Sequence, residues 1–418
     1  MFYLEIQDTD ILITGRANSA GKDDDKMVSR NKTDAAWAKE SWAKETWAKK
    51  AWAKLEPKLL AECRRTNSSL PFIPVEGRYR DCMMPNGIWW WTNGFWPGLL
   101  WQAYHATGNE EYRTAACDAG QRLSDTLLHP EHLDHDTGFL FQPSAVAQFR
   151  ITKDSDARAA AIRAAGLLAH RMNEQGGFLR AWNKSPWMED SSGLMIIDCM
   201  MNLPLLFWAS EETNDPYYRE TAVRHADTSL RFLLRPDGSC AHIASFNSLT
   251  GEFLGTLGGQ GYGEGSAWSR GQGWAVYGFA LAYRHTGKHE FLNAAKRCAH
   301  YCIAALSQND WLPLRDFRAP ANPVKYDSGA GAVIACGLLE LEKHLPELEQ
   351  PLYRASATAI LRACEEKFAD YDPDIDGVLG GGATMYHDER LADAAIIYND
   401  YFYTEAVLRL LDKDFLIW

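Results

Sequence analysis

The sequence lacks the patterns by which cysteines mark a metal site or a disulfide framework. Its nine cysteines, an odd number, are scattered through segments of helical pattern in a chain of 418 residues. Cys298 and Cys302 stand one helical turn apart, but a zinc ion needs two further ligands and the nearby sequence offers none. We therefore expect reduced core thiols, no metal and no other cofactor.

Long apolar runs and an excess of positive charge are also missing. The sequence has no stretch of about 18 apolar residues, and Met1 to Lys26 lacks the basic, apolar and small-residue sections of a secretory signal. The formal net charge of −12 disfavours binding to nucleic acid or to an anionic membrane. These absences predict a soluble, cytoplasmic protein, and they leave open whether it is a monomer or a dimer.

The motifs of nucleotide and serine-hydrolase chemistry are absent as well. The glycine-rich segment Gly255 to Gly265 is followed by neither a Lys-Ser/Thr pair nor a clear start of a helix after a strand. No nucleophile elbow occurs, and the histidines do not fall at the spacing of metal ligands. Nucleotide binding is therefore not favoured.

Tryptophan, by contrast, is abundant and divides the chain in two. Four of the sixteen tryptophans recur in a Trp-Ala-Lys pentad before residue 53. Because a five-residue step turns by about 500° on a helix, these side chains spiral round it and form no single buried stripe. We expect Met1 to Lys50 to be a poorly packed or partly helical extension, with a partner-binding helix as the alternative, and Ala51 to Trp418 to be one catalytic domain.

The domain repeats a unit of helix, turn and helix. The three clear copies have their turns at Thr107 to Tyr112, Thr213 to Tyr218 and Thr286 to Phe291. In each copy Thr followed by Gly or Asn ends the first helix, as helix-end chemistry favours. Helix pairs of this kind bury their apolar faces only by stacking on neighbouring pairs.

The two helices of each pair differ in character. The first are apolar nearly all round, as in Leu203 to Trp208, whereas the second carry charges on one face, as in Arg219 to Arg231. This difference favours an inner ring covered by an outer ring, and about six pairs fit after Leu55. We predict an all-α fold, an (α/α)6 barrel, with short strands at Phe139 to Phe141 and Cys240 to Ala244.

One carboxylate lies in an unusual context. Asp198 interrupts the apolar run Leu194 to Met201, where ionisation is costly, so that it can hold a proton near neutral pH and donate it. A buried aspartate that caps a helix explains the same pattern equally well.

Three other kinds of residue are candidates for a site. Asp136 lies beside a histidine in a polar loop, Leu133 to Phe139, although aspartate and glycine are common in turns. Arg270, in a Ser/Gly loop between two tryptophans, suits the binding of a carboxylate or sulfate. Trp91, Trp182 and Trp274 offer flat faces for a sugar ring, although burial in the core is the usual place of any one tryptophan.

Four blocks of the sequence, in order and at matching spacing, resemble unsaturated glucuronyl hydrolases, glycoside hydrolase family 88. The blocks are Trp91 to Trp96, Leu133 to Leu140, Ile196 to Leu206 and Gly265 to Trp274. The resemblance spans about Leu55 to Leu411. It implies an (α/α)6 barrel that works without a metal on a small acidic oligosaccharide.

The resemblance also implies residue roles. Asp198 corresponds to the general acid/base and Asp136 to the second catalytic carboxylate. The residues that correspond to substrate-binding positions are His135, His242, Gln260, Arg270, Trp91, Trp182 and Trp274. At one position this chain differs, because Asn93 stands where the best-known member has Asp.

The implied reaction is the release of a terminal 4,5-unsaturated uronic acid from fragments made by a lyase, of glycosaminoglycan or gellan type. Protonation of C4 in the vinyl ether leaves positive charge at C5, water adds there, and the resulting hemiketal opens. One carboxyl group that gives a proton and takes one from water is sufficient. Three alternatives are a hydrolase of unsaturated galacturonyl-rhamnose, a glycosidase acting at the anomeric carbon, and a helical ring that only binds acidic sugars.

Overall fold

The structure, a computed structural model, describes residues 47–84, 86–184 and 189–418. Its compact unit runs from Ala48 to Trp418. The predicted extension lies outside the described residues except for its last four, which begin a helix over residues 47–66. Among the helices of the described ranges, none has the length and apolar character that crossing a membrane requires.

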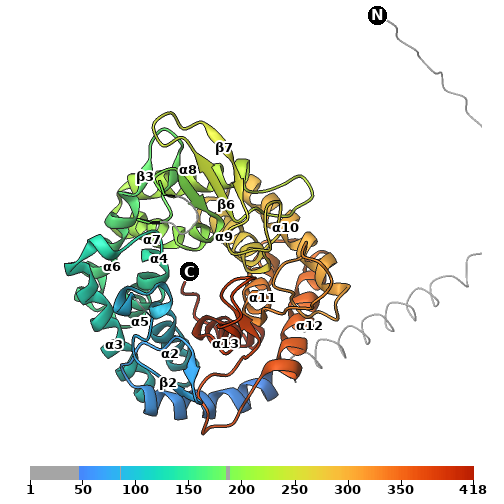
Figure 1. Ribbon diagram of the computed structural model, residues 1–418. Coiled ribbons are helices and arrows are strands. Elements are labelled where there is room, and N and C mark those ends of the chain that lie inside the picture. The colour runs from blue at the N-terminus through green and yellow to red at the C-terminus, as the bar shows by residue number, and fades with distance from the viewer. Residues whose placement is uncertain (1–46, 85, 185–188) are drawn as a thin grey trace, which may run out of the picture. The chain divides into compact units, whose positions relative to one another are not determined.

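The helices of the compact unit alternate between two concentric layers (Figure 1). The inner layer contains α2 (Phe95–Thr107), α4 (Thr137–Phe141) with its continuation through η5 (Gln142–Val146) into α5 (Ala147–Thr152), α7 (Leu203–Thr213), α9 (Ser269–Thr286), α11 (Ser328–Glu342) and α13 (Ile397–Leu410). The outer layer contains the helix over residues 47–66, α3 (Glu110–Asp125), α6 (Ser155–Ala169), α8 (Pro216–Phe232), α10 (His289–Ser307) and α12 (Gln350–Phe368).

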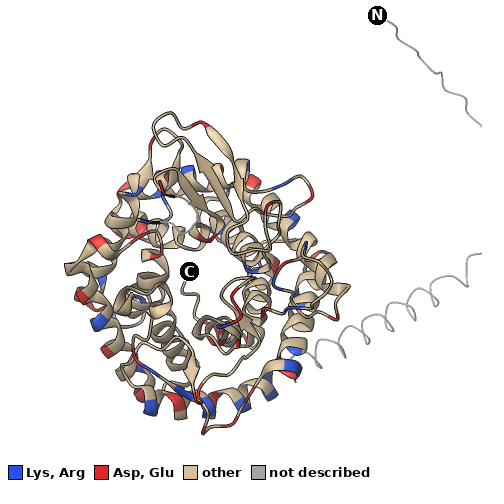
Figure 2. Cartoon of the chain, viewed as in Figure 1, with Lys and Arg blue, Asp and Glu red and all other residues tan. Residues whose placement is uncertain are grey.

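The ring is closed, because α13 packs against both α11 and α2. Every residue of α11 and of α13 is buried, whereas α8 buries only the side of the helix that faces the ring. The charged residues accordingly lie mostly on the outer helices (Figure 2). The prediction of an all-α ring with apolar inner helices and amphipathic outer helices is confirmed.

Helix-end chemistry sets the turn within each pair, as the repeated Thr-Gly and Thr-Asn motifs predict. After α2, Gly108 adopts a left-handed conformation (φ 71°), and the Asn109 side chain accepts a hydrogen bond from the backbone N of Glu111. After α7, Asn214 takes the same conformation (φ 56°), and Asp215 caps α8 by accepting from Tyr217 N. These turns reverse the chain in a few residues, so consecutive helices lie side by side.

Short strands occur only in the connections between helices of the described ranges. The largest sheet is antiparallel and contains β5 (Leu194–Ile196), β6 (Ile243–Phe246) and β7 (Phe253–Leu257), in that order. Three two-stranded sheets pair β1 (Pro74–Val75) with β2 (Arg78–Tyr79), β3 (Met172–Asn173) with β4 (Phe178–Leu179), and β8 (Gly382–Ala383) with β9 (Ala392–Ala394).

One predicted strand is wrong and the other is displaced. Phe139 to Phe141 belong to helix α4, because a short apolar run fits a buried helix as well as a strand. The strand predicted at Cys240 to Ala244 begins only at Ile243, after an isolated bridge between Cys240 and Leu234.

The chain after α13 turns into the centre of the ring (Figure 1). Trp418 is buried there, with its indole stacked on Phe402 and in edge contact with Phe139. The side chain of Gln142 donates a hydrogen bond to the backbone oxygen of Ile417 at 2.6 Å. The segment 411–418 therefore fills the axis of the ring beneath the loops described next.

Candidate active site

Two loops that lead into inner helices carry the predicted carboxylates. Asp136 immediately precedes α4, and Asp198 lies in the 3-10 turn η6 (Ile197–Met201), which leads into α7. The backbone N of Ile197 donates to the oxygen of His242 at 3.0 Å, extending the pairing of β5 with β6. This pairing brings the distant His242 beside Asp198.

Asp198 pairs with that histidine and does not cap a helix. Its Oδ2 lies 3.4 Å from Nε2 of His242, and the residue is only 8% exposed. No side-chain hydrogen bond caps η6, whose N-cap residue is Ile196, or α7, whose N-cap residue is Asn202. Asp198 Oδ2 has no hydrogen-bond partner among the described residues. The capping explanation is therefore not supported, and a buried carboxylate oxygen is left for a ligand or a proton.

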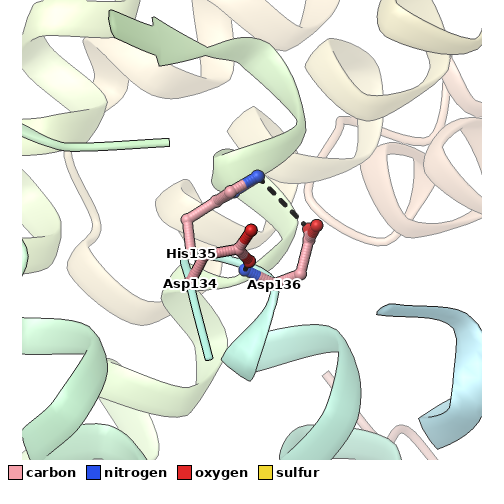
Figure 3. Close-up of side chains that lie close together, drawn as sticks. All are labelled: Asp134, His135 and Asp136. Atoms are coloured by element: carbon pink, nitrogen blue, oxygen red, sulfur yellow. Dashed lines mark hydrogen bonds and ion pairs between the residues drawn. The ribbon is translucent and has the colours of Figure 1, made fainter. Parts of the chain in front are cut away.

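Asp136 forms a second pair of the same kind (Figure 3). Its Oδ1 lies 3.4 Å from Nε2 of the buried His135. Burial raises the pKa of Asp136 well above its ordinary value, and the negative charges of Asp134 and Asp198 raise this pKa further. Burial also holds the pKa of His135 well below its ordinary value. The pair therefore combines a carboxyl group that holds its proton to a higher pH than an ordinary aspartate with an imidazole that is uncharged near neutral pH.

Asp134 completes the only described cluster of three side chains that could hold a metal ion. One donor atom each from Asp134, His135 and Asp136 lies within 4.8 Å of the others. Asp134 Oδ1, however, accepts a hydrogen bond from the backbone N of Asp136 at 3.0 Å. Because bonds within the loop account for this proximity, we assign no metal to the cluster.

Two of the predicted sugar platforms lie at the surface of the site. Trp91 and Trp182 are partly exposed, and the indole of Trp182 lies edge-on to His135, with ring centroids 6.1 Å apart. Trp91 stacks on Tyr398 at 5.4 Å and an interplanar angle of 25°. Trp182 therefore lies beside the His135–Asp136 pair, and Trp91 lies against Phe139 of the helix that follows this pair.

Asn93 secures the loop that carries Trp91. Its side-chain amide donates hydrogen bonds to the backbone oxygens of Gly87 and Ile88 at 3.1 and 2.9 Å. An ionised aspartate cannot donate hydrogen bonds, so asparagine at this position stabilises the loop by contacts that a carboxylate would lack.

The third tryptophan and the arginine lie deeper than a ligand-contacting role requires. Trp274 is 0% exposed and packs against Phe139 and Phe402, so it presents no face to a ligand in this structure. Arg270 is 1% exposed, and its guanidinium pairs with Asp327 and donates to the backbone oxygen of Thr384 at 2.6 Å. The apolar burial of Trp274 and the bonds of the Arg270 guanidinium to Asp327 and Thr384 place both behind the surface of the site, although Nε of Arg270 has no hydrogen-bond partner among the described residues.

Gln260 lies between the site and a neighbouring loop. Its backbone N donates to Nδ1 of His242 at 3.0 Å, and its side-chain amide donates to the oxygen of Thr384 at 2.8 Å. The predicted residues that the structure gathers at one place are thus Asp136, Asp198, His135, His242, Gln260 and Trp182. Trp91 adjoins them through its contacts with Phe139 and Tyr398.

Sequence reasoning missed three residues of this region. Asn202, Asp327 and Tyr398 contact His135, Arg270 and Trp91, respectively. Only Asn202 carried a signal, because it is a polar residue at the end of the same apolar block that contains Asp198.

Comparisons with known proteins agree with this fold and identify the family of the chain. The family model described as Glycosyl Hydrolase Family 88 matches residues 72–309. The chain therefore belongs to glycosyl hydrolase family 88 and is a glycoside hydrolase.

The relatives that match about three quarters of this chain are named after two related activities. The chain is 40% identical to an unsaturated glucuronyl hydrolase of Bacillus sp. (strain GL1) over 77% of this chain and 86% of that protein. It is 35% identical to an unsaturated chondroitin disaccharide hydrolase of Streptococcus pyogenes serotype M1 over 76% of this chain and 80% of that protein. A solved structure of a mutant unsaturated glucuronyl hydrolase from Streptococcus agalactiae, complexed with dGlcA-GalNAc6S, superposes with a TM-score of 0.76 at 29% identity, covering 90% of this chain and 94% of that chain.

Proposed function

We propose that this enzyme removes the terminal 4,5-unsaturated uronic acid from acidic oligosaccharides of glycosaminoglycan or gellan type. The observation that carries the proposal is the presence of two His-Asp pairs, each with a buried imidazole, at one end of a helical ring. The names of the relatives support the same substrate class, since they refer to unsaturated glucuronyl and chondroitin disaccharide substrates. A ring that only bound sugars would have no need of carboxylates buried beside imidazoles.

Asp198 acts in the proposal as the general acid/base. It gives a proton to C4 of the vinyl ether, and positive charge then develops at C5 and on the ring oxygen. The same carboxylate takes a proton from the water that adds at C5, after which the hemiketal opens and the remaining sugar leaves. General acid/base catalysis of this kind contributes about 10²- to 10⁴-fold in rate.

Asp136 takes a different part, because its pKa is raised well above that of an ordinary aspartate, which favours its protonated form. A neutral carboxyl group donates a hydrogen bond to a sugar oxygen, which an ionised one cannot do. The negative charges of Asp134 and Asp198 are among the causes of this raised pKa, so both charges oppose loss of the proton from Asp136.

The remaining proposed contacts position the sugar. His135, His242 and Gln260 hold substrate and water, and Trp91 and Trp182 provide apolar faces for the ring. Arg270 and Trp274 support these residues from behind, with Arg270 contributing positive charge near an anionic substrate.

The test is a steady-state assay of the purified protein on unsaturated disaccharides from chondroitin, hyaluronan, heparin and gellan, sulfated and unsulfated. Hydration of C4=C5 removes the ultraviolet absorbance of the conjugated double bond, so absorbance should fall on at least one of these substrates. A decrease on unsaturated galacturonyl-rhamnose alone would refute the proposed substrate class. No decrease on any of these substrates would refute the proposed hydrolase activity.

Variants test the roles. Asp198→Asn keeps the shape of the side chain but cannot transfer a proton, so kcat should fall by about 10²- to 10⁴-fold, with a much smaller change in KM. Asp154→Asn is the matched control, since Asp154 caps α6 and asparagine caps a helix equally well. A folded Asp198→Asn enzyme that keeps more than about a tenth of wild-type kcat would exclude the proton-donor role.

We place the enzyme in the cytoplasm as part of this proposal. All nine cysteines are free thiols, and seven of them are buried. Reduced thiols are typical of cytosolic proteins. Fractionation of the source cells should find the protein with the cytoplasmic marker enzymes, and recovery in the extracellular fraction would contradict the assignment.

A further inference from the structure

Asn202 connects the two loops that carry the catalytic carboxylates. It follows η6, which contains Asp198, and its Oδ1 accepts a hydrogen bond from the backbone N of Phe139 at 2.7 Å. Asn202 packs so closely on this loop that a Cβ added to the neighbouring Gly138 would lie only 2.5 Å from the Asn202 side chain. The residue is completely buried.

The other end of the Asn202 amide faces His135. Its Nδ2 lies 3.3 Å from Nδ1 of the imidazole. The orientation of the amide is fixed, since reversing it would point an NH2 group at the N–H of Phe139. An amide nitrogen only donates, so Nδ1 of His135 must be the acceptor. Because burial keeps this imidazole neutral, its single proton is on Nε2.

The proton on Nε2 points toward Asp136. This nitrogen is buried, lies 3.4 Å from Asp136 Oδ1 and has no closer hydrogen-bond partner among the described residues. Hydrogen bonds of catalytic groups are often long before substrate binds and shorten in the complex. The N–H is therefore available to Asp136 or to a substrate oxygen beside it.

His242 is held in the same way by different atoms. Its Nδ1 accepts from the backbone N of Gln260 at 3.0 Å, and its Nε2 faces Asp198 Oδ2 at 3.4 Å. The imidazole of His242 can lie this close to the backbone only because residue 259 is glycine. A Cβ there would lie 1.9 Å from Nδ1 of His242, and the backbone has φ +58°. Two histidines on separate loops thus present Nε2 to a carboxylate and Nδ1 to an N–H donor.

We infer that Asn202 is a positioning residue of the reaction, which fixes the Nε2–H tautomer of His135 so that this imidazole presents a hydrogen-bond donor at Asp136. The inference deepens the proposed function and rests on it for its catalytic consequence. The other tautomer would present a lone pair to the Asp136 carboxyl group and to any sugar oxygen next to it. The donor would then be lost without any change in the position of the ring.

The first measurement is the ¹⁵N spectrum of the wild-type protein with labelled histidine side chains, in which the shifts of the two ring nitrogens distinguish the tautomers. His135 is assigned as the signal that His135→Gln removes. We expect an Nε2–H imidazole that stays neutral across the pH range of stability. An Nδ1–H tautomer or an imidazolium near neutral pH would overturn the inference.

The second measurement uses Asn202→Asp, which keeps an oxygen for the N–H of Phe139 but places an acceptor against Nδ1. The proton should move to Nδ1 of His135, and kcat should fall by about 10- to 100-fold with little change in KM, as is typical when an outer partner of a catalytic group is lost. If the proton moves to Nδ1 but kcat is unchanged, the claim that the tautomer of His135 matters for the reaction is overturned. Asn93→Asp is the matched control, a buried amide that donates to the backbone oxygens of Gly87 and Ile88 and to no histidine, and it should leave the His135 signal unchanged.

If Asn202→Asp does not fold, Asn202→Ser replaces it. The shorter hydroxyl cannot reach both partners, so His135 should show a mixture of tautomers together with a reduced kcat. A single Nε2–H tautomer in that variant would overturn the role of Asn202. The wild-type spectrum needs no substrate, so a protein inactive on every oligosaccharide would refute the proposed function and leave the tautomer assignment to be decided separately.

Discussion

Replacing Asp136 with asparagine should stabilise the folded protein at neutral pH, although the same change should abolish most activity. Burial raises the pKa of Asp136 first of all, and the charges of Asp134 and Asp198 raise it further. The carboxyl group therefore resists ionisation in the folded chain but ionises freely in the unfolded chain. An amide has the same shape and never ionises, so the variant lacks this destabilising contribution.

The sign and the slope follow from linkage. The unfolded pKa of an aspartate is about 3.9, and that of Asp136 in the folded protein is higher. Between the two values the folded state binds the extra proton, so this group lowers the free energy of unfolding by about 1.4 kcal/mol for each unit that pH rises. The contribution is absent below the unfolded pKa and becomes constant above the folded pKa.

Urea unfolding from about pH 4 to about pH 8 measures this difference. The free energies of wild type and Asp136→Asn should coincide at the acid end and separate as pH rises, with the variant more stable. Asp154→Asn, which preserves a helix cap, should follow the wild-type curve throughout. Parallel curves for wild type and Asp136→Asn would refute the raised pKa of Asp136.

Three further predictions concern the rest of the chain. Trp418→Ala should lower the free energy of unfolding, measured in urea, by about 3–5 kcal/mol, because it opens a cavity among buried aromatic rings. Trp418→Phe should lower it clearly less, and equal losses for the two variants would contradict this packing. Exhaustive dialysis against a chelator should leave activity unchanged, and activity restored only by an added metal would refute the metal-free reaction. Deleting Met1 to Thr46, just before the helix over residues 47–66, should leave kcat unchanged, and a tenfold loss in a folded truncated protein would count against it.

The ring was predictable because its causes are local. Thr107-Gly108 and Thr213-Asn214 end helices by conformations that each dipeptide favours by itself, and the contrast between apolar and charged helices follows from which layer each one occupies. Phe139 to Phe141 were assigned to a strand because three apolar residues show no period. Their helical conformation depends on Asn202 and on the ring packed around them.

The sequence indicates which residues are candidates for the site, but not how deeply each side chain is buried. Asp198 stood out because an ionisable group in an apolar run is unusual, and it is indeed buried. The Ser/Gly sequence around Arg270 predicts a loop, yet Arg270 lies in the first turn of α9. Arg270 and Trp274 are both covered because Asp327, Phe139 and Phe402 come from other helices and loops. Partners so distant along the chain leave no local signal. The pairing of His242 with Asp198 likewise depends on strand pairing across the β5–β6 connection.

Closure of the ring imposes an order on biosynthesis. Helix α13 and Trp418 complete the axis on which Phe139 packs, and the ribosome makes them after every residue of the two His-Asp pairs. Synthesis proceeds at about 5–20 residues per second, so the nascent chain exposes the apolar face of α2 for many seconds before α13 covers it. A nascent chain therefore cannot hydrolyse substrate until that helix has emerged, and the exposed inner helices are the surface that a chaperone would bind during this interval.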